Sequence, residues 1–171
     1  VTYEDPSGNT STCTADITVE DNFAPAAICN DITVELDSAS GTYTLTPADS
    51  SEIVDGTFDA CGFTVTIDPS TFSCADTSEN TVLVTYTDPS GNESECEAVV
   101  TVLDVTPPTA VCNDITISLD STGNYTLTTA DSSDIVDGTF DACTWTYTLD
   151  TVSFNCSDVG VNVVTVVYTD P

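Results

Sequence analysis

The chain has 171 residues, 29 of them aspartate or glutamate, and it contains no lysine, arginine or histidine, so its formal charge is −29. These absences exclude an imidazole base, a lysine Schiff base, and a cationic phosphate or nucleic-acid site. Hydrophobic residues still make up 40% of the chain, so we expect a folded protein that is not an enzyme.

An internal repeat of about 82 to 83 residues organises the chain, the spacing from Cys61 to Cys143 and from Cys29 to Cys112. Residues 54–61 return unchanged as residues 136–143, and residues 1–9 return as residues 84–92 with one change. We expect three parts: residues 1–22 are the C-terminal part of one repeat, residues 23–105 are a complete repeat, and residues 106–171 are the N-terminal part of the next. We also expect this chain to be a window of a longer array, whose partners are further copies of itself.

Alternating apolar and polar residues predict five strands in the complete repeat, each with one side toward a core. The sequence Asp-Pro-Ser-Gly-Asn at residues 88–92 predicts a turn between the last two strands. We find no helical periodicity of useful length. Strands spaced by about ten residues favour an all-β fold of tandem immunoglobulin-like β-sandwiches. In chain order, the core-facing residues are Ile32, Val34 and Leu36; Tyr43 and Leu45; Phe63, Val65 and Ile67; Val82, Val84 and Tyr86; Ala98, Val100 and Val102.

The joints between repeats are short and contain proline, at Pro25 and at Pro107 and Pro108. Proline restricts the backbone, so these joints favour a stiff rod over a flexible string.

Eight cysteines lie in a chain rich in Ser, Thr and Asp, without any Cys-x-x-Cys pair. Structural zinc sites need closely spaced thiolates, so this pattern indicates disulfides in an oxidising compartment. We expect an extracellular or cell-surface protein. No apolar run of about 20 residues is present, so we expect no membrane insertion in this segment.

Four motifs of the complete repeat resemble the hyalin repeat family, in particular the tandem copies in secreted proteins of Bacteroidota. They are the Cys-x-Asp-Ile-Thr-Val start at residues 29–34, Asp-Ala-Cys-Gly at residues 59–62, the hairpin at residues 84–96 and the Val-Thr-Val-x-Asp exit at residues 100–104. The resemblance covers the whole chain and implies immunoglobulin-like extracellular modules associated with adhesion. It implies no catalytic residues. One departure is that Asn30 and Asn113 follow the first cysteine, where the family usually has proline.

In an immunoglobulin-like sandwich the first strand begins at the end that holds the last hairpin turn. This arrangement predicts a bond between Cys29 and Cys96. Cys61 and Cys74 flank an expected hairpin around residues 68–70, so they are predicted to pair.

By the same repeat logic Cys143 is predicted to pair with Cys156, while Cys13 and Cys112 bond to partners before residue 1 and after residue 171. A rival pairing would bridge each joint. We disfavour it because about seven strand residues separate Cys13 from its joint, which exceeds the reach of a disulfide. The rival bonds are Cys13–Cys29 and Cys96–Cys112.

Calcium is the candidate cofactor, because hard cations prefer several oxygen ligands and the loops at one end of each repeat are rich in them. A cation at a joint would also offset part of the repulsion among the acidic residues. The alternative is that these residues only form turns on a solvated surface. The candidate metal ligands are Asp21, Asn22, Asp55, Asp59, Asp88 and Asn92, with Asp104, Asp137, Asp141 and Asp170 as their counterparts.

Covalent glycans are a second candidate modification. Ser38, Ser121 and Thr151 each follow an aspartate and precede an apolar residue or threonine, which resembles the short O-glycan acceptor used in Bacteroidota. Four Asn-x-Ser/Thr sequences also match the N-linked pattern. The alternative is plain surface Ser and Thr, which strands and turns favour.

These features favour a structural repeat of an extracellular filament or adhesin stalk. The alternative is a surface-binding module whose outward threonine rows meet a carbohydrate or ice surface. The second row is not kept between copies, since Thr144 stands where the first copy has Gly62. This difference favours the structural function. The two rows are Thr42, Thr44 and Thr46, and Thr144, Thr146 and Thr148.

Overall fold

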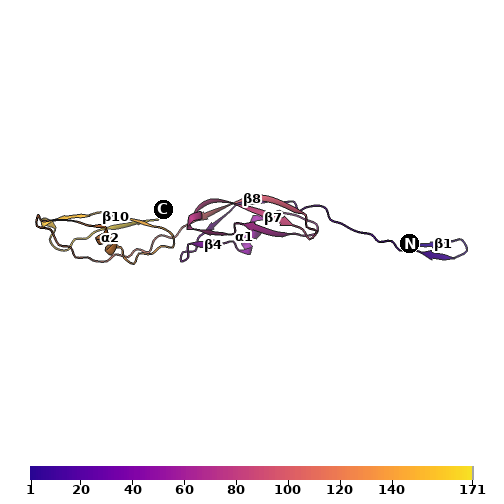
Figure 1. Cartoon of the computed structure of the whole chain (residues 1–171), viewed down its shortest axis with the longest axis horizontal. Coiled ribbons are helices and arrows are strands. Elements are labelled where there is room, and N and C mark those ends of the chain that lie inside the picture. Colours follow the sequence, from indigo (N-terminus) through magenta and orange to yellow (C-terminus); the bar gives the residue numbers. More distant parts are fainter. Residues whose placement is uncertain (171) are drawn as a thin grey trace.

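The computed structural model describes residues 1–170 of the chain. The molecule is long and narrow and consists mostly of β-structure (Figure 1). The first repeat, residues 23–105, and the second repeat, from residue 106 onward, lie end to end. The N-terminal segment, residues 1–22, extends from the far end of the first repeat (Figure 1).

The first repeat contains a four-stranded sheet in the order β3 (Ile32–Glu35), β8 (Glu93–Leu103), β7 (Ser78–Thr87) and β5 (Thr64–Asp68). β3 runs parallel to β8, and the other neighbours are antiparallel. The predicted turn at residues 88–92 is confirmed: its backbone N–H groups at Ser90 and Asn92 both donate to Asp88 Oδ1, at 2.8 Å.

A second sheet of the first repeat pairs β4 (Thr42–Thr44) with β6 (Thr71–Ser73). Side chains from both sheets form one core, so the five predicted strands are present, with their apolar sides inward. The buried core residues are Ile32, Val34, Leu36, Ile53, Phe72, Val82, Val84, Tyr86, Ala98, Val100 and Val102.

A short helix, α1 (Pro47–Ile53), corrects the expectation that the chain has no helix. Thr46 caps it through a capping box: its hydroxyl accepts a bond from the Asp49 N–H, and the Asp49 carboxylate accepts one from the Thr46 N–H at 2.7 Å. Ile53 is fully buried at its end. Seven residues are too few for a periodic pattern, but the cap was readable in the sequence.

The second repeat, as far as the structure describes it, contains counterparts of β4, α1, β5, β6, the single-turn 3-10 helix η1 (Cys74–Asp76) and the end of β7. β9 (Asn124–Thr126) pairs with β11 (Ser153–Asn155), and β10 (Thr146–Leu149) pairs with β12 (Val166–Thr169). The helix α2 (Thr129–Ile135) repeats α1, and the 3-10 helix η2 (Cys156–Asp158) repeats η1. Residues 115–118, which match β3, form no strand, and residues 106–170 contain no counterpart of β8.

The N-terminal segment forms a hairpin of β1 (Thr2–Glu4) and β2 (Thr10–Thr12). It matches the tip of the β7–β8 hairpin, but residues 1–20 are all exposed. Among residues 1–170, no helix is long and apolar enough to cross a membrane.

The predicted Cys29–Cys96 disulfide is confirmed, with Cα atoms 6.0 Å apart. The predicted Cys61–Cys74 bond is wrong. β5 and β6 lie in different sheets, so residues 68–70 carry the chain between sheets instead of forming a hairpin. β5 alone therefore holds Cys61 and Cys74 about 16 Å or more apart, at opposite ends of the repeat.

The predicted Cys143–Cys156 bond is wrong for the same reason, because Cys143 bonds to Cys74 of the first repeat. The rival bonds across the joints, Cys13–Cys29 and Cys96–Cys112, are also excluded, since Cys29 and Cys96 bond to each other. The remaining cysteines are exposed and unbonded in the structure described: Cys13, Cys61, Cys112 and Cys156.

Candidate functional site

The Cys74–Cys143 disulfide joins the two repeats side chain to side chain. Cys74 follows β6 at the end of the first repeat, and Cys143 lies in the loop before β10, at the near end of the second. Their Cα atoms are 5.5 Å apart although 69 positions separate them in the sequence. The repeats are therefore linked twice, by this bond and by the main chain. We call the contact region around both links the junction.

A glycine at the junction lets the two backbones approach closely. Gly41 lies in the turn between β3 and β4 with φ of +62°. A Cβ atom added to Gly41 would lie 2.9 Å from the Ala142 carbonyl oxygen and 2.6 Å from Cys74 Sγ. Both distances are too short for a real side chain, so this position needs glycine for its conformation and for its space.

We call residues 21–26 and residues 104–109, which lead into the first and the second repeat, the connecting segments. The second of them lies against the loop at residues 136–143 of the second repeat. The Thr109 N–H donates to the Phe140 carbonyl at 2.8 Å, and the Phe140 N–H donates back at 3.4 Å. In the first repeat, the Ala26 N–H donates in the same way to Phe58, at 3.0 Å. In both repeats the first residues after the joint are thus hydrogen-bonded to a loop of the same repeat.

Acidic side chains converge at the junction. Asp104 comes from the connecting segment and Asp141 from the loop, and one ligand atom from each lies within 4.8 Å of the other and of Cys143 Sγ. Each aspartate uses Oδ1 to accept a local backbone N–H, from Thr106 at 3.2 Å and from Cys143 at 2.8 Å. Each leaves Oδ2 buried without a hydrogen-bond partner. Buried carboxylate oxygens of this kind are costly unless a cation compensates them.

Asp170, at the end of β12, adds a third carboxylate. Burial raises the pKa of Asp170, and the negative charges of Asp104 and Asp141 raise it further. The chain has no lysine, arginine or histidine that would neutralise this group. These three carboxylates repel one another, and a bound cation would compensate their charges.

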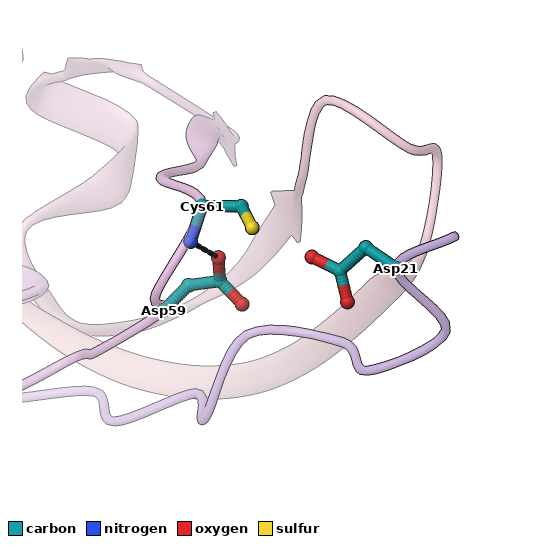
Figure 2. A group of neighbouring side chains, drawn as sticks. All are labelled: Asp21, Asp59 and Cys61. Atoms are coloured by element: carbon teal, nitrogen blue, oxygen red, sulfur yellow. Dashed lines mark hydrogen bonds between the residues drawn. The ribbon is translucent and has the colours of Figure 1, made fainter. Parts of the chain in front are cut away.

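The first repeat carries the same group at its own near end. Figure 2 shows Asp21 from the connecting segment pointing toward Asp59 and Cys61. The Phe23 N–H donates to Asp21 Oδ1 at 3.1 Å, and the Cys61 N–H donates to Asp59 Oδ1 at 2.8 Å. Hydrogen bonding to Asp21, and then the charge of Asp21, raises the pKa of the Cys61 thiol.

The chemistry of these donors suits a hard cation. Calcium binds about six to eight oxygens, so the three carboxylates of the junction would supply part of its coordination shell. The Cys143 sulfur is engaged in the disulfide and is not available as a ligand.

Some predicted metal ligands lie near these groups but are already hydrogen-bonded. Asp88 is 4% exposed and accepts bonds from Ser90 and Asn92 in its own turn. Burial raises the pKa of Asp88, but the bonds from the Asn92 side chain and from the turn backbone outweigh it and lower the pKa overall. Asn92 also donates to the Asp21 carbonyl at 3.1 Å, so the turn packs against the connecting segment.

Other predicted ligands do not join the clusters. Asp55 and Asp137 accept amide bonds from Asn30 and Asn113 through their backbone carbonyls, and their side chains are exposed. Asn22 is exposed as well. The structure therefore brings together Asp21 with Asp59, and Asp104 with Asp141, while Asp170 lies near enough for the charges of Asp104 and Asp141 to raise its pKa.

The sequence reasoning missed the bond between repeats and the role of Gly41. One usable signal was the octapeptide shared by residues 54–61 and 136–143, which ends in cysteine and marks one surface kept in both repeats. The candidate glycan acceptors Ser38, Ser121 and Thr151 are all exposed.

Comparison of the chain with protein family models and with curated proteins finds no match.

Proposed function

We propose that this chain is a structural tandem-repeat segment of an extracellular filament or adhesin stalk. Each repeat is an immunoglobulin-like β-sandwich of the hyalin-repeat kind, and the array is stiffened by covalent and cation links between repeats. Its partners are further copies of the same repeat.

One observation carries this proposal: the disulfide between Cys74 and Cys143 links two repeats instead of two strands of one repeat. Such a bond adds little to the folding of either repeat alone, because it closes no loop within a repeat. It restricts the angle between repeats and transmits tension past the main-chain connection. Both effects suit a filament under load in an oxidising environment.

Calcium is the second link in the proposal. Asp104 comes from the connecting segment and Asp141 from the loop, so one ion bound to both would hold these parts together, and Asp170, which follows β12, adds negative charge beside them. The ion would also compensate the buried Oδ2 atoms of Asp104 and Asp141. Glycans at the exposed Ser38, Ser121 and Thr151 would add protection at the surface.

The alternative function, surface binding through threonine rows, has weaker support. Thr42 and Thr44 are exposed on β4, but this strand has three residues. In the second repeat the matching strand β9 has Asn124 in place of Thr42. A flat binding surface needs a regular row in every repeat, and this row is short and not kept.

Thermal unfolding tests the calcium-stiffened structure. The melting temperature is measured with calcium and with excess chelator, for the parent chain, for Asp141→Asn and for Asp137→Asn as the matched control. Asp137 lies four residues from Asp141 in the same loop region, but its side chain is outside the cluster. The proposal predicts a saturable calcium-dependent rise that Asp141→Asn reduces and Asp137→Asn retains. Equal melting temperatures in calcium and in chelator would contradict the proposal that a cation stabilises the chain.

A further inference from the structure

One segment of the first repeat crosses the repeat from end to end between two cysteines. Cys61 lies at the near end, beside Asp21 of the connecting segment, and Cys74 lies at the junction, where it bonds to Cys143. The segment between Cys61 and Cys74 contains β5 and β6. β5 leaves the near end along the second half of β7, and β6 continues in the other sheet toward the junction. The chain therefore covers the length of the repeat once, in a single direction.

The second repeat contains a segment of the same kind. Cys143 lies at its near end, β10 and β11 follow, and Cys156 lies at its far end. Cys156 Sγ lies 3.6 Å from a glycine carbonyl oxygen, and Cys74 Sγ lies 3.5 Å from the matching one, so the two far ends are built alike. The Cys74–Cys143 disulfide joins the end of the first segment to the start of the second. We call the two segments and this bond the tension path, which comprises residues 61–74 and residues 143–156.

The tension path is much shorter than the main chain beside it. Twelve residues, 62–73, separate Cys61 from Cys74, so this segment reaches about 45 Å when it is fully extended. The folded repeat is about 33 Å long along the ten residues of β7. The segment therefore has little slack, about 12 Å. The main chain from Cys61 to Cys143 could instead extend to about 280 Å, because it contains a whole repeat.

Tension applied at the two cysteines of a repeat acts along the segment instead of across it. β5 pairs with β7 from Thr64 to Asp68, and its axis follows the direction in which the cysteines would be pulled. A force along a strand loads its hydrogen bonds together, because these bonds lie across the strand. β6 is anchored in the core by Phe72, which is 1% exposed. The sandwich therefore need not open for the path to become taut.

We propose that the tension path carries load through consecutive repeats and limits how far they can stretch. The limit is about 45 Å for each repeat, compared with about 280 Å for a repeat held by its main chain alone. Cys61 is the counterpart of Cys143, and Cys156 is the counterpart of Cys74, so the same path can continue through further repeats of the array. The inference rests on the proposed function, because it explains how a filament of such repeats bears tension.

The Cys29–Cys96 disulfide lies outside the tension path. It joins the entry to β3 with β8, and neither strand belongs to the path. Its removal would destabilise the repeat but would leave the covalent route through Cys74 and Cys143 in place. The two disulfides can therefore be separated by experiment, since only one of them limits the length.

The test pulls single molecules in optical tweezers by the two ends of the tension path. The thiols of Cys61 and Cys156 are exposed, so DNA handles can be attached to them through maleimide groups. The other two unbonded cysteines are removed by Cys13→Ser and Cys112→Ser, so that no further thiol reacts. This tethered chain is the parent for the variants that follow.

Breaking the path should lengthen the fully stretched chain about threefold. The tethered parent chain reaches a limit of about 95 Å. Cys74→Ser with Cys143→Ser raises this limit to about 320 Å, since the load then passes through the main chain. The matched control, Cys29→Ser with Cys96→Ser, keeps a limit of about 95 Å although it also lacks one disulfide. A parent chain or a control that stretches to about 320 Å would overturn the proposal.

A second measurement shows whether the folded chain is loaded through the bond. At a constant force that unfolds the variant without the Cys74–Cys143 bond, the parent chain should stay folded until dithiothreitol is added. A thiolate of this reagent attacks one sulfur, and the other cysteine leaves as a thiolate and takes up a proton. The second thiol of the reagent then releases the first cysteine and closes an oxidised ring. The chain should then lengthen by about 220 Å in one step.

The rate of this step should rise with the applied force, because attack on sulfur lengthens a bond that the tension already stretches. A rate that does not depend on force, or unfolding of the parent chain at the same force as the variant, would overturn the proposal. Failure of the proposed function is seen in a different measurement: the melting temperature would be the same with calcium and with chelator, whatever the length limit of the chain.

Discussion

Cys74 and Cys143 belong to different repeats, yet their Cα atoms lie 5.5 Å apart and their sulfurs are bonded. Cys29 and Cys96 form the bond within a repeat, between the entry to β3 and the start of β8. The chain therefore has one disulfide within the first repeat and another between the two repeats.

Removing the bond within the first repeat should reduce its stability strongly. Cys29 and Cys96 are 67 positions apart, and a closed loop of this size contributes about 4 kcal/mol in the chain-entropy model. The Cys29→Ser and Cys96→Ser double variant should lose most of this free energy of unfolding, measured by urea denaturation. The Cys74→Ser and Cys143→Ser double variant is the control, and it should lose much less stability within the first repeat. Equal losses in the two variants would contradict the assignment of roles.

Gly41→Ala should damage the junction, because its Cβ would meet the Ala142 carbonyl and the Cys74 sulfur. Gly91→Ala is the matched control: Gly91 also has a positive φ, of +88°, but nothing lies within 4 Å of its added Cβ. Both variants carry backbone strain of about 1 kcal/mol. Only Gly41→Ala should lower the yield of the Cys74–Cys143 bond during oxidative refolding, measured by peptide mass spectrometry. If Gly91→Ala lowers the yield of this bond as much as Gly41→Ala does, the close approach of Gly41 to Ala142 and Cys74 is not the cause.

The α1 capping box should make stability depend on acid pH. Burial raises the pKa of Asp49, but hydrogen bonds from Thr46 and Tyr43 outweigh it and lower the pKa overall. A lowered pKa in the folded state stabilises above the unfolded pKa, and this stability is lost as the pH falls through the folded value. Asp49→Asn should cost about 0.5 to 1 kcal/mol at neutral pH.

The difference between the parent chain and Asp49→Asn should shrink as the pH falls from about 5 to about 2. Thermal melting over this range measures it. Glu52→Gln is the control, since Glu52 is exposed on the same helix and outside the capping box. A difference that stays constant with pH would show that the charge of Asp49 does not stabilise the helix.

The strands and one disulfide were predictable from local patterns. Val82, Val84 and Tyr86 alternate with polar residues, and all three are fully buried. The turn that begins at Asp88 fixes β8 beside β7, which brings Cys96 to the end where Cys29 enters. The strand prediction used residues that are close in the sequence, and the disulfide prediction needed in addition only the turn at residues 88–92.

The junction was not predictable in the same way. The pairing of Cys74 depends on the chain crossing between sheets after β5, and residues 68–70 fit a hairpin equally well. The partner Cys143 depends on how two whole repeats meet end to end. The buried Oδ2 atoms of Asp104 and Asp141 likewise depend on packing between the connecting segment and the loop. The acidic composition pointed to a cation, but it did not separate Asp141 from the exposed Asp137.

The central claim is that the Cys74–Cys143 bond holds two repeats in line, and small-angle X-ray scattering measures this directly. The chain is compared with the Cys74→Ser and Cys143→Ser double variant, with the remaining thiols blocked so that both stay single molecules. The account predicts that the parent chain scatters as a rod with the dimensions of the structure, and that the variant gives a broader distribution with a smaller mean radius of gyration. Identical scattering from the two, or a bent parent chain with its disulfide intact, would contradict the account.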